Sequence, residues 1–230
     1  ARPSVMTEAA SWALTHMRYD GVNGEGTGTR ASLDQFFVRE GRLDVTATFF
    51  KDWEVKVQAD FPTGSTSNTS GTLQDAWIIW KRFKEISVRF GQFKEPFSQE
   101  TLCSGRFIDF DERSVVSRIA PGRDLGFSIF GKLFDDILEY ELGVFNGQGR
   151  AVLDTSDEKD IAVRIAANPF LTTDIEALQK LRIGFALTYG IIDNGSFDGL
   201  DLTSTLMGVK FLDATAGSID GGRLRWDLEL

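Results

Sequence analysis

Residues 53–61, WEVKVQADF, alternate without a fault between apolar and polar side chains. Trp53, Val55, Val57, Ala59 and Phe61 would share one face, and the four charged or amide residues between them would share the other. This period of two is typical of a β-strand that is apolar on one side only. The stretch is longer than the usual strand of about 5–6 residues and suits the ~9–11 residues of a tilted membrane-crossing strand.

The same period recurs along most of the chain. Leu138, Tyr140, Leu142 and Val144, for example, alternate with two glutamates and a glycine. We therefore predict an all-β protein. The predicted strands lie at residues 11–19, 34–50, 53–61, 73–81, 85–92, 124–134, 137–146, 160–168, 181–190, 204–212 and 223–230.

The predicted connections fall into two classes by length. The short ones are 51–52, 82–84 and 135–136, and the long ones are 20–33, 62–72, 93–123, 147–159 and 191–203. The two classes alternate along the chain until 169–180, so the short turns would share one end of the sheet. Outer-membrane barrels have this layout. Aromatic residues beside the short turns would form an interfacial girdle; they are Phe49, Phe50, Trp53, Trp80, Phe83 and Phe134.

Composition and charge exclude several classes of protein. A net charge of −9 over 230 residues argues against a nucleic-acid partner. One cysteine, Cys103, excludes an internal disulfide, and with the only histidine far away at His16 we expect no metal site and no cofactor. The chain has no run of about 18 apolar residues, so we predict no transmembrane helix. The start, ARPSVMTEAA, lacks the pattern of a signal peptide, so we expect a mature form or the inside of a longer chain.

A soluble β-sandwich or lipocalin-like barrel is the alternative to a membrane barrel, because its strands alternate equally well. A soluble barrel would carry lysine and glutamate along its outer face. Here the polar positions are also rich in glycine, alanine, serine and threonine, which a water-filled lumen tolerates. A sandwich also has no reason to sort its loops by length. These features favour the membrane barrel.

Five segments resemble the phosphate-selective porin O and P family in order and spacing. They are FKDWEVKVQADF (50–61), LQDAWIIW (73–80), VRFGQFKEPFS (88–98), ERSVVSRIAPGRDLGF (112–127) and LEYELGVFNGQG (138–149). The resemblance is good over residues 34–190 and loose elsewhere. It implies an outer-membrane barrel of sixteen strands, usually a homotrimer, whose third external loop folds into the pore. Residues 93–123 would be that loop, because they form the third long connection.

The chain departs from the family in its length. We count ten or eleven strands, and the chain ends at RLRWDLEL without the usual C-terminal aromatic. We therefore expect residues 1–230 to be one β-barrel domain that is incomplete at its C-terminus, since an open half-barrel would leave unpaired edges in lipid.

Pore selectivity would depend on charged side chains that face the lumen. In the third loop, Thr101 stands where the resemblance implies a phosphate-binding lysine, and Ser104 and Arg106 fit the neighbouring polar and basic positions. The predicted solute contacts at the constriction are Lys94, Ser104, Arg106, Arg113 and Arg118. The predicted lumen wall is Asp75, Arg89, Arg164, Arg182, Arg223 and Arg225.

The same charges have a purely structural interpretation. The polar faces of the clearest strands carry as many acids as bases, so cross-lumen ion pairs could simply hold the barrel, and salt bridges could tie the loop to the wall. Enzyme sites are not indicated: the carboxylates Asp109, Asp111 and Glu112 lack the companions of a metal or acid–base site.

We therefore predict a passive outer-membrane channel for small hydrophilic solutes, in particular anions such as phosphate. Its partners would be outer-membrane lipid, two further copies of the chain and the permeating solute. The alternative is a structural or adaptor barrel that houses or anchors a partner protein in the outer membrane.

Overall fold

The computed structural model describes residues 6–21, 34–61, 71–108, 113–114, 117, 119–150, 152, 157–197, 201–203, 210–213 and 217–230. The strands are β1 (Met6–Gly21), β2 (Asp34–Phe49), β3 (Trp53–Asp60), β4 (Thr72–Trp80), β5 (Ser87–Lys94), β6 (Arg123–Leu133), β7 (Leu138–Phe145), β8 (Asp160–Ala167), β9 (Ile183–Phe197), β10 (Asp201–Thr203), β11 (Lys210–Asp213) and β12 (Gly217–Glu229). The helices are single turns: α1 (Gln99–Leu102), η1 (Gly105–Phe107) and α2 (Glu176–Gln179). The all-β prediction is confirmed.

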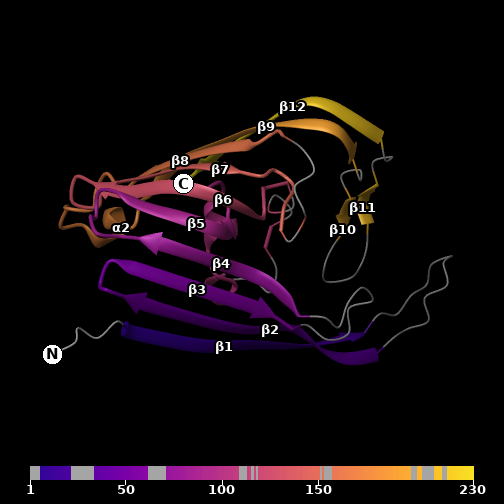
Figure 1. Ribbon diagram of the computed structural model, residues 1–230, viewed down its shortest axis with the longest axis horizontal. Coiled ribbons are helices and arrows are strands. Elements are labelled where there is room, and N and C mark those ends of the chain that lie inside the picture. The colour runs from indigo at the N-terminus through magenta and orange to yellow at the C-terminus, as the bar shows by residue number, and fades with distance from the viewer. Residues whose placement is uncertain are drawn as a thin grey trace.

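Ten strands form one antiparallel sheet in the order β1-β2-β3-β4-β5-β6-β7-β8-β9-β12. Figure 1 shows them side by side, from β1 at the bottom of the view to β9 and β12 at the top. Neighbouring strands follow each other in the chain, so successive connections lie at opposite ends of the sheet. Residues 50–52, 81–86, 134–137 and 168–182 connect the strands at one end, and the long segments connect them at the other. The predicted division is confirmed for the three short turns, which share one end of the sheet, whereas the connection 168–182 at the same end is long.

Two of the short turns use backbone conformations that are rare for these residues. Phe50 and Lys51 have φ of 49° and 68°, and Phe134, Asp135 and Asp136 have φ of 55°, 54° and 72°. Left-handed residues match the twist of the flanking strands in a tight hairpin, although they are costly for bulky side chains. Both turns expose a phenylalanine, Phe50 at 58% and Phe134 at 72%, which keeps aromatic rings at this end of the sheet.

Of the predicted strand at 204–212, residues 204–209 lie outside the described residues, and residues 210–212 form part of β11 rather than a strand of the ten-stranded sheet. The described part of this region forms a separate two-stranded sheet of β10 and β11, and β9 pairs directly with β12 from Gly217 opposite Phe197 to Glu229 opposite Gly184. The start of β12, GSIDGG, has one apolar residue, so no alternation reveals it. Backbone hydrogen bonds build this part of the ladder, and they do not depend on the side-chain pattern.

The burial of the sheet is inverted with respect to a soluble protein. Apolar side chains along the strands are exposed, for example Phe90 at 57%, Ile161 at 50% and Trp226 at 67%. The residues between them are mostly polar or small and are less exposed. A flat single sheet would expose both faces alike, so the sheet curves around its polar side, as a barrel wall does.

A small apolar cluster lies on the polar side as well. Phe93 and Phe145 are each 1% exposed, and their rings meet edge to face with centroids 5.2 Å apart. The Arg89 guanidinium lies 4.2 Å from the centroid of Phe93 and 4.9 Å from that of Phe130, within the range of a cation–π contact. This packing fixes the end of β5, where the segment 93–123 leaves the sheet.

Candidate functional site

The buried polar side of the sheet is the candidate functional site, and we call it the polar face. It is built by the polar half of each alternating strand, so the sequence pattern that makes the outside apolar also makes the inside charged. Its buried polar members are Asp44, Gln58, Asp60, Gln74, Asp75, Ser87, Gln92, Asp124, Ser128, Asp160, Arg164 and Thr188.

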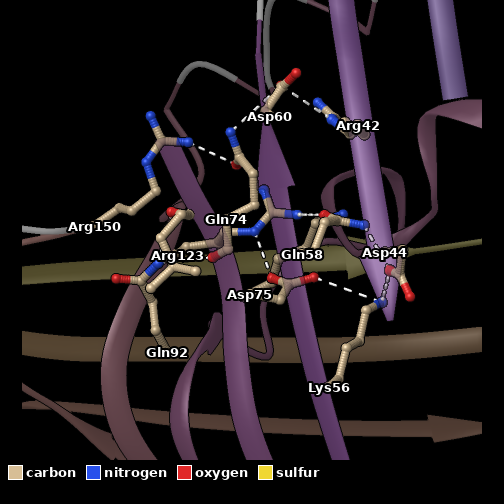
Figure 2. A network of polar contacts seen from close by, with 12 residues as sticks. Arg42, Asp44, Lys56, Gln58, Asp60, Gln74, Asp75, Gln92, Arg123 and Arg150 are labelled. Atoms are coloured by element: carbon tan, nitrogen blue, oxygen red, sulfur yellow. Dashed lines mark hydrogen bonds and ion pairs between the residues drawn. The ribbon is translucent and has the colours of Figure 1, made fainter. Parts of the chain in front are cut away.

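One half of the polar face carries a continuous network on β2, β3 and β4, shown in Figure 2. Asp44 is fully buried and accepts from Lys56 at 2.9 Å and from Gln58 at 2.8 Å. Lys56 also lies 3.7 Å from Asp75, and Arg123 at the start of β6 donates to Asp75 at 2.6 Å and to Gln58 at 3.3 Å. Acids, bases and amides therefore satisfy one another across four strands, as buried polar groups must. We call this set the β2–β4 network.

The network continues toward the end of the sheet that carries the long connections. Arg42 pairs with Asp60 at 3.2 Å, and the Gln74 amide reaches Asp60 at 3.5 Å. Arg150, in the connection after β7, donates to the Gln74 side-chain oxygen at 2.6 Å. Gln92 of β5 donates to the carbonyls of Leu73 and Gln74 at 2.9 and 2.8 Å. Through Arg150, a long connection is thus bonded to this half of the polar face.

The other half of the polar face, on β5 to β12, is organised as arginine–carboxylate pairs. Arg89 pairs with Glu141, and Arg182 with Glu139. Arg223 pairs with Asp160 at 2.5 Å, and Arg164 with Glu229 at 2.5 Å. In three of these pairs the partners lie two strands apart in the sheet, and Arg182 directly precedes β9, which is two strands from β7. Among the described residues, Arg225 is the predicted wall arginine without a carboxylate within 4 Å.

The segment 93–123 folds back on itself around α1. Lys94 Nζ donates to the carbonyls of Leu102 and Cys103 at 3.2 and 3.1 Å, and also to that of Thr101. Arg113 donates to the same Cys103 carbonyl at 2.6 Å. A cation at the C-terminal end of a helical turn satisfies carbonyls that have no partner within the turn. These contacts order the segment internally.

The segment also touches the far side of the sheet. The backbone N–H of Gln99 donates to Glu229 Oε1 of β12 at 2.8 Å, and Arg164 of β8 donates to the Gln99 side-chain oxygen at 2.8 Å. The segment leaves the sheet between β5 and β6, yet it bonds to β8 and β12. It therefore lies over the polar face.

Glu95 lies at the base of this segment and is 5% exposed. Its backbone N–H donates to the Gly122 carbonyl at 3.0 Å, and its Oε2 is buried without a hydrogen-bond partner among the described residues. Burial raises the pKa of Glu95 to about 8. The negative charges of Asp160 and Asp124 raise this pKa further, and the positive charges of Arg225 and Arg223 lower it in part. The carboxyl is therefore mainly protonated at neutral pH.

The structure places the sequence-predicted residues as follows. Asp75, Arg89, Arg164, Arg223 and Arg225 lie on strands of the ten-stranded sheet, and Arg182 directly precedes β9. Lys94 and Arg113 meet at the Cys103 carbonyl. The Ser104 carbonyl accepts from the Phe107 N–H at 2.9 Å, and Arg106 lies within η1. Arg118 lies outside the described residues, so its predicted role stays a prediction, as do the solute contacts of the others.

Sequence reasoning missed several residues of the site, among them Glu229, Gln99 and Glu95. Glu229 continues the inward positions Arg223, Arg225 and Asp227 by the same period of two, so its place on the polar face was available from the pattern. Gln99 and Glu95 lie in a segment without alternation, and no sequence signal distinguishes them from other loop residues.

Within the described residues, no helix is long and apolar enough to cross a membrane. Residues 15–194 match the family described as phosphate-selective porin O and P. The chain is also 22% identical to Porin O of Pseudomonas aeruginosa over 207 residues, which cover 90% of this chain and 46% of the relative. The chain thus spans about half the length of the curated relative that it matches.

Proposed function

Because the chain belongs to the phosphate-selective porin O and P family, a family of bacterial outer-membrane proteins, we propose that the full-length protein is a porin. It is a channel rather than an enzyme. Small hydrophilic solutes diffuse passively along its polar face, and anions such as phosphate are the preferred class. Residues 1–230 belong to a single barrel domain, and the barrel assembles as a homotrimer, as the family's members usually do.

The observation that carries this proposal is the inverted burial of the sheet. An exposed apolar face suits a hydrocarbon surround, and a charged concave face suits water. A soluble β-sandwich with the same alternation would bury its apolar side chains and expose its polar ones. Charged rings along a lumen are the means by which a pore distinguishes ions.

In this proposal the segment 93–123 is the third external loop and forms the constriction. Its contacts with β8 and β12 support this, because the segment crosses the polar face between them and β5. Lys94, Ser104, Arg106, Arg113 and Arg118 are the proposed solute contacts. Because Lys94 and Arg113 already donate to carbonyls of α1, we expect them to act mainly by holding α1, and the anion preference to rest also on side chains of the wall.

Conductance of the full-length protein in planar lipid bilayers tests the channel. We expect stepwise, voltage-independent currents in KCl, and a reversal potential in a salt gradient whose sign shows that chloride is preferred over potassium. Added phosphate should reduce the chloride current, since the two anions would compete for the same path.

Two results would overturn parts of this proposal. Barrels that migrate as folded protein but carry no current would refute the channel and leave a structural barrel that anchors a partner. Currents carried preferentially by potassium would refute the anion preference alone. Chemical crosslinking in outer-membrane fragments tests the trimer, which a ladder that ends at the monomer would contradict.

A further inference from the structure

Gln99, Arg164 and Glu229 form a junction that links three parts of the chain, and we call it the loop junction. Arg164 Nε donates to Glu229 Oε1 at 3.1 Å, and its terminal nitrogen donates to Glu229 Oε2 at 2.5 Å. That terminal nitrogen also bonds the Gln99 side-chain oxygen at 2.8 Å. The Gln99 backbone N–H donates to Glu229 Oε1 at 2.8 Å. One residue of α1 is therefore held through both its side chain and its backbone.

The junction differs from the neighbouring pairs in its burial and its reach. The Arg164 and Glu229 side chains are each 9% exposed, whereas the Arg182 side chain is 30% exposed and its partner 21%. The pair has the two-pronged geometry that makes an arginine–carboxylate contact directional as well as strong. Glu229 uses Oε1 for both Arg164 and Gln99, so removing the carboxylate releases the loop and leaves a buried guanidinium without its charge partner.

A glycine in the neighbouring strand leaves room for the Glu229 carboxylate of the junction. A Cβ at Gly184 of β9 would lie 2.4 Å from Glu229 Oε2, closer than atoms can approach, so a larger residue there would displace the carboxylate. Arg164 also lines a hollow on the polar face together with Phe130, Lys132, Glu139 and Glu141. The junction thus lies where the loop, the wall and an open part of the polar face meet.

We propose that the loop junction positions the segment 93–123 over the polar face and thereby sets the width of the pore. Gln99, Arg164 and Glu229 are positioning residues: they act through the loop and need no contact with solute. This inference rests on the proposed porin function for its effect on current, but the position of the loop can be measured without any current.

Cys103 supplies a reporter for that position. It is the single cysteine of these 230 residues, it follows α1 directly, and it is half-buried. A charged, water-soluble thiol reagent reacts with it at a rate that depends on how firmly α1 is held. The extent of modification at Cys103 is measured by mass spectrometry of full-length protein in detergent, and the single-channel conductance of the same protein is measured in planar bilayers.

The test variants are Arg164→Gln, Glu229→Gln and Gln99→Ala. Gln99 is exposed, so its variant is expected to fold even if the other two do not. The matched controls are Arg182→Gln and Glu141→Gln, which remove the same charges from wall pairs that have no bond to α1. Heat-modifiable migration on gels verifies that every barrel is folded.

We expect Glu229→Gln and Arg164→Gln to accelerate modification of Cys103 roughly tenfold, which corresponds to a loss of about 1.4 kcal/mol in the seating of the loop, and Gln99→Ala to accelerate it less. Their conductance should rise and become noisier, while both controls should modify Cys103 at the wild-type rate. Unchanged modification in folded junction variants, or equal acceleration in the controls, would overturn the inference. A wild type without current would refute the porin function instead, and the Cys103 measurement would still decide whether the junction holds the loop.

Discussion

The two halves of the polar face solve the same physical problem in different ways. On β2 to β4, three carboxylates share lysine, arginine and amide donors in one network, and each is 8% exposed or less. On β5 to β12, most arginines have one carboxylate each, and several of these pairs remain partly open to water. A shared network loses several bonds when one member is removed, whereas separate pairs lose one. We therefore expect the first half to stabilise the wall and the second to tolerate change, except where a pair reaches the loop.

The strongest test of this contrast is Asp44→Asn in the β2–β4 network. The substitution keeps the shape but removes the charge that Lys56 faces at 2.9 Å, leaving that ammonium with Asp75 at 3.7 Å. We expect a loss of about 3–5 kcal/mol in the free energy of unfolding, the usual cost of breaking a buried pair. Urea unfolding in lipid vesicles, followed by tryptophan fluorescence, measures it.

Asp52→Asn is the matched control for that experiment. Asp52 lies in the turn between β2 and β3, and its pair with Arg82 spans 3.9 Å, with the Arg82 side chain 62% exposed and that of Asp52 35%. Pairs of this kind contribute about 0–1 kcal/mol. Equal losses in the two variants would contradict the idea that the network stabilises the wall.

The second test concerns Glu95, at the base of the loop beside the half built from pairs. Its pKa is raised to about 8 from an ordinary value of 4.5, so the folded state holds a proton that the unfolded state releases above pH 4.5. Stability should therefore fall as pH rises from about 4.5 to 8 and level off above that. Thermal unfolding across this range should show a falling Tm, with a flatter profile in Glu95→Gln.

Other groups also titrate in this range, so the difference between the two profiles is the informative quantity. The charged groups that act on the pKa of Glu95 include Asp124, Asp160, Arg223 and Arg225, and they are the same in both proteins. Parallel profiles for the wild type and Glu95→Gln would rule out a protonated Glu95 in the folded state.

The third test asks whether Lys94 contacts solute or holds the loop. Its Nζ donates to three carbonyls at the end of α1, so Lys94→Gln should loosen α1 and speed the modification of Cys103. We expect a cost of about 1.5–3 kcal/mol in local stability, the range for hydrogen bonds to a charged group. The anion preference, measured as a reversal potential, should change less than the rate of modification. A large loss of anion preference with no change at Cys103 would favour direct solute contact.

The smallest effect is expected for Arg182→Gln in the half built from pairs. Its partner Glu139 also pairs with Lys132 at 2.8 Å, so the carboxylate keeps a cation after the substitution. We expect a change of about 1 kcal/mol or less in the free energy of unfolding. A loss as large as that of Asp44→Asn would show that the two halves do not differ.

Much of the wall followed from residue alternation. Strands 53–61 and 160–168 were predicted within one residue of their observed ends, because inside and outside residues differ sharply in polarity there. The start of β12 was missed because GSIDGG satisfies the ladder through its backbone alone. The sequence did not indicate which charged residues pair. Alternation places both Arg182 and Glu139 on polar faces, but the curvature of the sheet decides which side chains come within reach of each other.

By itself, the sequence determined which face of each strand is apolar, which connections are short and which family the chain belongs to, because these depend on local period and composition. Only the tertiary structure decided what the charges do. Gln99 and Glu229 are 130 residues apart, and Arg164 is 65 residues from each; no local pattern links them. Curving the sheet around its polar face brings them within hydrogen-bonding distance, and the low exposure there makes an unpaired charge costly enough to fix their arrangement.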